Sequence, residues 1–75
     1  MSSYKGHALD ALRNRAEADQ FEALASLKIM LDHPAGIGDH STTDLHNNLN
    51  EALSKLADAE DRLETLRKYY GELNG

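Results

Sequence analysis

The second half of the chain carries a regular repeat of apolar residues, at alternating intervals of four and three positions. Its members are Leu45, Leu49, Ala52, Leu56, Ala59, Leu63, Leu66, Tyr70 and Leu73. Such a heptad pattern lines one narrow face of an α-helix, whereas a strand would place alternate members in water. The pattern therefore predicts a helix over residues 42–71, and Leu53, beside the repeat, widens its apolar face.

Polar residues support the same helix. Ser41 and Asp44 have the spacing of a capping box at its start, and Arg67 and Lys68 suit the negative end of its dipole. Acid–base pairs four residues apart stabilise an exposed helix by roughly 0.2–0.5 kcal/mol each. The sequence predicts three of them: Glu51–Lys55, Asp58–Arg62 and Glu64–Lys68.

The first half is also helical in pattern, over residues 3–32, but its apolar stripe is less regular. The stripe comprises Leu9, Leu12, Ala16, Gln20, Leu24, Leu27 and Leu31. Its consecutive steps of four drift from a strict heptad toward an 11-residue repeat. Phe21 and Ile29 lie off the stripe, on a face shared with small alanines. Large residues on two faces of one helix indicate more than one packing partner.

A loop is predicted between the helices, over residues 33–41. Pro34 keeps His33 out of the helical region, and Gly36 and Gly38 permit backbone angles that other residues resist. A connection of this length is consistent with antiparallel neighbours. The expected fold is therefore all-α, a two-helix antiparallel hairpin forming one domain over residues 1–75.

The hairpin is expected to dimerise into a four-helix bundle. A chain of 75 residues without cysteine has a small core and no disulfide to stabilise it, so self-association is the simplest remedy. A two-fold dimer is the commonest closed assembly. A higher homo-oligomer and a different protein partner stay open. The residues expected at the interface are Phe21, Ile29, Leu53, Leu56 and Leu63.

The formal net charge of −5 disfavours bulk attraction to nucleic acid or anionic lipid. The longest apolar run, Ile29–Leu31, is far shorter than the roughly 20 residues that span a bilayer. The first residues lack the apolar core of a signal peptide. We therefore expect a soluble, cytoplasmic protein.

Three kinds of chemistry compete with a plain interaction role. Imidazole and carboxylate groups at His33, Asp39 and His40 suit a divalent metal. No paired helical ligand motif accompanies them, and turn chemistry in a polar connector accounts for them better. The sequence therefore predicts neither a metal nor a cofactor. No catalytic constellation is recognisable either, so the chain is expected not to be an enzyme.

The third kind is nucleic-acid binding through Arg62, Arg67 and Lys68, beside Tyr69 and Tyr70. Helix-dipole and acid–base pairing account for the same three basic residues. An RNA- or DNA-binding hairpin is therefore the alternative to a protein that acts by self-association and protein–protein interaction.

Residues 33–41 (HPAGIGDHS), residues 56–64 (LADAEDRLE) and Tyr69-Tyr70 resemble short uncharacterised proteins of T-even-like tailed phages, including cyanophages. The resemblance covers most of the chain. It implies a virus-encoded accessory or regulatory protein in the host cytoplasm, and no activity or site residue comes with it.

Overall fold

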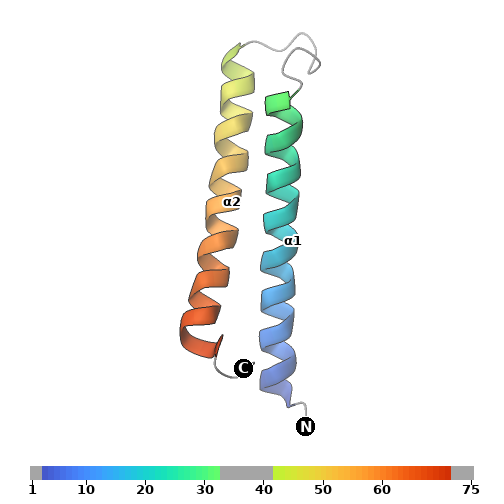
Figure 1. Ribbon diagram of the computed structural model, residues 1–75, viewed down its shortest axis with the longest axis vertical. Coiled ribbons are helices and arrows are strands. Elements are labelled where there is room, and N and C mark those ends of the chain that lie inside the picture. The colour runs from blue at the N-terminus through green and yellow to red at the C-terminus, as the bar shows by residue number, and fades with distance from the viewer. Residues whose placement is uncertain (1–2, 33–41, 72–75) are drawn as a thin grey trace.

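The structure, a computed structural model, describes residues 3–32 and 42–71. It contains two α-helices of 29 residues each, α1 (Tyr4–Asp32) and α2 (Thr42–Tyr70), and no strand within the described ranges. The helices lie side by side and antiparallel in a rod of 54 × 18 × 17 Å (Figure 1). The predicted all-helical hairpin is thus confirmed.

Ser3 caps the start of α1. Its Oγ accepts a hydrogen bond from the Gly6 N–H at 3.1 Å, and its carbonyl accepts one from the His7 N–H at 3.0 Å. The first contact satisfies a donor that the first turn of a helix leaves without an intrahelical partner, and the second is the first i→i−4 bond of the helix. At the other helix, Asp44 lies in the first turn and Arg67 and Lys68 in the last, as the dipole favours. The predicted cap residue Ser41 lies outside the described residues.

Small residues form the buried core between the helices. The buried apolar side chains of the described residues are Ala16, Ala23, Ala52 and Ala59, and no large side chain is fully buried. In α2 these alanines alternate with the half-buried Leu49, Leu56 and Leu63, as the heptad predicts. Because a methyl group is short, alanines permit close approach of two helices, and the leucines then reach only partly into the contact.

The predicted stripe of α1 is partly wrong. Leu12, Leu24 and Leu31 are exposed, whereas Arg13 and Met30, which the prediction omitted, are half-buried. The positions that face α2 are Leu9, Arg13, Ala16, Gln20, Ala23, Leu27 and Met30. Their steps alternate strictly between four and three, so α1 follows the same heptad as α2 and has no drift toward an 11-residue repeat.

Two of the three predicted acid–base pairs within α2 are present. Lys55 lies 3.7 Å from Glu51, and Arg62 lies 3.1 Å from Asp58. The third prediction is wrong, because Glu64 pairs with Arg67, three residues on.

Candidate interaction surfaces

The two long flanks of the hairpin differ in character. Each residue lies about 100° further round its helix, so in antiparallel helices the residues that follow a buried alanine emerge on the same side. Leu24 follows Ala23 and Leu53 follows Ala52, which places both leucines on one flank. Both are exposed, Leu24 at 43% and Leu53 at 54%.

The same periodicity places the half-buried leucines at the contact between the helices on this side. We call the surface the apolar flank. It consists of Leu24, Leu27, Leu31, Leu49, Leu53 and Leu56. None of these side chains carries a charge, and together they occupy the half of the rod nearer residues 32 and 42. The structure therefore exposes a continuous row of leucines beside a core made only of alanines.

The five residues predicted at an interface do not share one surface. Leu53, Leu56 and Leu63 lie on the side of the apolar flank, the last two half-buried. Phe21, 66% exposed, stands at the outer edge of the same side. Ile29, 60% exposed, lines a groove along the opposite flank.

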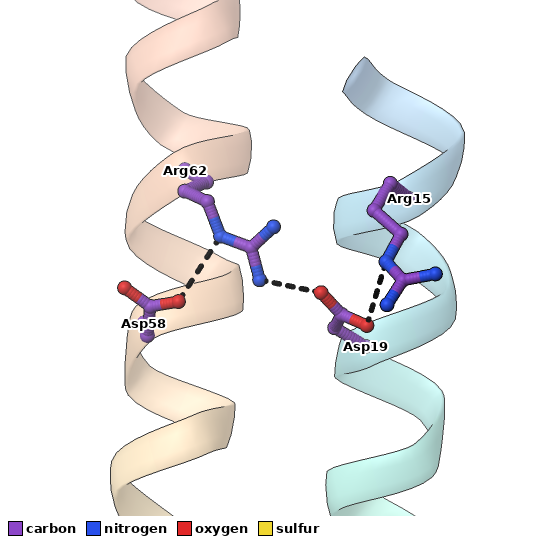
Figure 2. Close-up of polar contacts among 4 residues, drawn as sticks. All are labelled: Arg15, Asp19, Asp58 and Arg62. Atoms are coloured by element: carbon purple, nitrogen blue, oxygen red, sulfur yellow. Dashed lines mark hydrogen bonds and ion pairs between the residues drawn. The ribbon is translucent and has the colours of Figure 1, made fainter. Parts of the chain in front are cut away.

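That groove is lined by charged side chains of both helices as well as by apolar ones. Its floor includes Ala23 and Ala52, and its walls include Asp19 and Arg62. Arg62 Nη2 of α2 donates to Asp19 Oδ2 of α1 at 2.7 Å (Figure 2). We call this surface the charged flank.

Two further ions join the same network. Arg62 Nε donates to Asp58 Oδ2 at 3.1 Å, and Arg15 Nε lies 3.5 Å from Asp19 Oδ1, as Figure 2 shows. The row Asp58–Arg62–Asp19–Arg15 alternates in sign, so the charges compensate one another along the groove.

The network fixes both central groups in their charged forms. The hydrogen bond from Arg62 lowers the pKa of Asp19, against the opposing effect of desolvation, and Arg15 adds to the lowering. The hydrogen bond to Asp19 raises the pKa of Arg62. Neither group exchanges protons near neutral pH, so this arrangement joins the helices rather than performing acid–base chemistry.

The three basic residues of the nucleic-acid alternative are held in different ways. Arg62 is engaged by Asp58 and Asp19, and Arg67 is engaged by Glu64, with its Nε 3.2 Å from Glu64 Oε2. The ammonium of Lys68 instead lies over the ring of Tyr69, at 5.3 Å from its centroid.

The fold also brings residues from the start of the chain to this end of α2. The ammonium of Lys5 lies 5.8 Å from the centroid of the Tyr70 ring. Tyr4, next to Lys5, is 88% exposed. We call the cluster of Tyr4, Lys5, Lys68, Tyr69 and Tyr70 the aromatic–basic end. The sequence interpretation included only its α2 members, although the antiparallel arrangement it predicted would have located the others.

The metal candidates His33, Asp39 and His40 lie outside the described residues. Within residues 3–32 and 42–71, His, Asp and Glu side chains form no group of three that is able to hold a metal ion. Neither described helix has an apolar stretch long enough to cross a membrane.

Comparison with known proteins gives no relative from which a function is transferable. No protein-family model matches the chain, and neither a curated protein nor a solved structure matches it significantly.

Proposed function

We propose that the chain is a non-enzymatic helical hairpin that acts by associating with a second copy of itself through the apolar flank. The two copies form a four-helix dimer. One observation carries this proposal: the leucines at 24 and 53 stay exposed on the same side, while only alanines are buried between the helices. Exposed apolar rows of this kind mark interaction surfaces.

The leucines cover one part of a long side of the rod. The apolar flank spans eight residues of each helix, about 12 Å of a side that measures 54 × 18 Å, so it supplies the centre of a contact and less than the ~800 Å² per partner of a standard interface. Complete burial of a leucine contributes about 1.5–3 kcal/mol. The six leucines of the apolar flank are half-buried or exposed in a single copy. Burying several of them further in a dimer would therefore stabilise the association.

The composition of the apolar flank permits a second copy as its occupant. The chain carries a net charge of −5, so two copies repel each other as whole molecules. All six residues of the apolar flank are leucines, so the contact itself sets no like charges together. A two-fold axis sets leucine against leucine and leaves both charged flanks in solvent.

The nucleic-acid alternative through Arg62, Arg67 and Lys68 receives less support. Two of its three basic groups already contact carboxylates, which compete with phosphate. An accessory role in a phage-infected cell rests on the sequence resemblance alone.

Analytical ultracentrifugation of the full chain and two variants tests the dimer. Leu53→Lys places a charge on the apolar flank, whereas Leu12→Lys places one at an equally exposed leucine, 56%, on the opposite side. We expect the unmodified chain and Leu12→Lys to sediment as dimers at micromolar concentration. Leu53→Lys should raise the dissociation constant at least about 100-fold, because burying an unpaired ammonium costs several kcal/mol.

Circular dichroism on the same samples separates dissociation from unfolding. If Leu53→Lys loses its helical signal, the milder Leu24→Ala replaces it, with a smaller expected weakening. A folded monomer for the unmodified chain contradicts the proposal, and so does equal weakening by Leu12→Lys.

A further inference from the structure

We propose that the aromatic–basic end binds single-stranded nucleic acid, with its tyrosine rings stacking on bases and Lys5 and Lys68 contacting phosphates. This site is distinct from the apolar flank and does not depend on dimerisation. It also differs from the basic face of α2, since neither Arg62 nor Arg67 is part of it.

Charge is distributed unevenly along the rod. Residues 1–15 and 63–75 carry five Lys or Arg and three Asp or Glu, a net charge of +2. Residues 16–62 carry three Lys or Arg and ten Asp or Glu, a net charge of −7. Because the chain folds back on itself, the described parts of these two segments, residues 3–15 and 63–71, meet at the same end of the rod (Figure 1). The end of the rod where α1 begins and α2 ends is therefore locally positive, although the protein as a whole is acidic.

The lysines of this end are available to a ligand. Among the described residues, Asp10 is paired with Arg13 and Glu64 with Arg67, and no carboxylate forms an ion pair with Lys5 or Lys68. Each lysine instead lies over a tyrosine ring, a contact worth only about 0.5–1 kcal/mol at an exposed site. A phosphate can replace it at small cost.

Salt screens this end from the acidic middle of the rod. Glu17 lies twelve residues beyond Lys5 in α1, about 18 Å along the helix, and Asp61 lies seven residues before Lys68 in α2, about 10 Å. At physiological ionic strength the screening length is about 8 Å. A ligand at the tip therefore responds chiefly to the local positive charge.

The aromatic rings favour nucleic acid over other polyanions. All three tyrosines of the chain lie at this end, and Tyr4 and Tyr69 are exposed, at 88% and 67%. Base–aromatic stacking contributes about 1–3 kcal/mol per base and tolerates any sequence. Single strands suit such a site because their bases are free to turn outward, which the bases of a duplex are not.

The chain provides its own optical probe for a test. It has no tryptophan, so its intrinsic fluorescence comes from the tyrosines of the aromatic–basic end. Titration of the full-length chain with a fluorescein-labelled oligothymidine of about 15 nucleotides, a length near known site sizes, gives two signals. We expect a rise in anisotropy and quenching of tyrosine fluorescence over the same concentration range.

Salt dependence and paired variants identify the site. With two phosphate contacts, the logarithm of the affinity should fall with the logarithm of salt concentration at a slope of about −1.4. Lys5→Gln with Lys68→Gln should bring the slope close to zero. The control, Lys28→Gln with Lys55→Gln, removes the same charge from the acidic part of the rod and should leave the slope unchanged. Tyr69→Leu should weaken binding about tenfold through lost stacking.

Three results overturn the proposal. The first is no anisotropy change at low salt, and the second is a loss of affinity in the control pair of lysine variants as large as in the pair at the aromatic–basic end. The third is binding to vesicles containing phosphatidylserine without binding to the oligonucleotide. Leu53→Lys leaves the aromatic–basic end intact, so each chain of this variant should bind the oligonucleotide as tightly as the unmodified chain does. Failure of the dimer and failure of this site are thus distinguishable.

Discussion

Arg62 of α2 donates a hydrogen bond to Asp19 of α1, and the 2.7 Å between Nη2 and Oδ2 is the shortest polar contact that joins the two helices in the described part of the chain. The second such contact, from Gln20 Nε2 to Glu60 Oε2, is longer at 3.4 Å. Alanine cores fit one another in several registers, because their side chains are all alike. A directional contact on the charged flank favours one of them.

Asp19→Asn should therefore lower the stability of the hairpin at neutral pH. The variant keeps the shape of the side chain but loses the charge that Arg62 contacts. Asp61→Asn is the control, since Asp61 is an exposed aspartate of α2 for which no ion pair is found. Thermal melts followed by circular dichroism at one chain concentration should show a lower midpoint for Asp19→Asn only.

The same pair predicts a pH dependence. The pKa of Asp19 is lower in the folded chain than its ordinary value of 3.8, so the folded state favours the carboxylate. The stabilisation is complete above the ordinary value and is lost as pH falls through the folded-state pKa. The difference in melting midpoint between the unmodified chain and Asp19→Asn should be constant from pH 7 to about 5 and shrink on further acidification. A difference that grows in acid would contradict the assignment.

The alanine core makes a further prediction. Ala16 is completely buried, so Ala16→Leu should force the helices apart and lower the free energy of unfolding by about 1–3 kcal/mol. Ala18→Leu makes the same change at an exposed position of α1 and should alter stability by less than about 0.5 kcal/mol. Guanidinium titrations of both variants provide the comparison.

The hairpin was predictable from sequence because α2 carries an uninterrupted heptad and Pro34 separates it from α1. The seam of α1 was predicted only in part, since Gln20 was included but Arg13, Ala23 and Met30 were not. Arg13 buries the stem of its side chain while its charged end reaches solvent, so selection by hydrophobicity passed over it. The exposed Leu12, Leu24 and Leu31 were chosen in place of these three positions.

The ion pair of Asp19 with Arg62 was beyond sequence reasoning for a different reason. Within a helix, spacing limits the partners of a charged residue to those three or four positions away, as for Asp58 and Arg62. Between helices, a pair depends on the register, and a shift of one residue would turn the heptad positions away from each other. The fold class therefore followed from the pattern of apolar residues. The residues of the two helices that lie together on each flank became known only from the structure.

Gln20 supplies another prediction, since it is the one polar, uncharged residue among the α1 positions that face α2. Gln20→Leu extends the apolar flank and removes only the 3.4 Å contact with Glu60. Polar residues at such heptad positions reduce stability and specify register. The variant should raise the free energy of unfolding by about 1 kcal/mol. Asn14→Leu, at an exposed position, should have little effect in the same denaturant titration.

The cap of α1 supplies the last prediction. Ser3 Oγ accepts the Gly6 N–H at 3.1 Å, and loss of a serine cap typically costs about 1 kcal/mol. Ser3→Ala should therefore lower the free energy of unfolding by about this amount, and Ser3→Asp should restore it, since a carboxylate accepts the same bond and suits the positive end of the dipole. Ser54→Ala, an exposed position inside α2, should have the opposite sign because alanine is the better helix former there. Equal effects of the two alanine substitutions would show that Ser3 has no capping role.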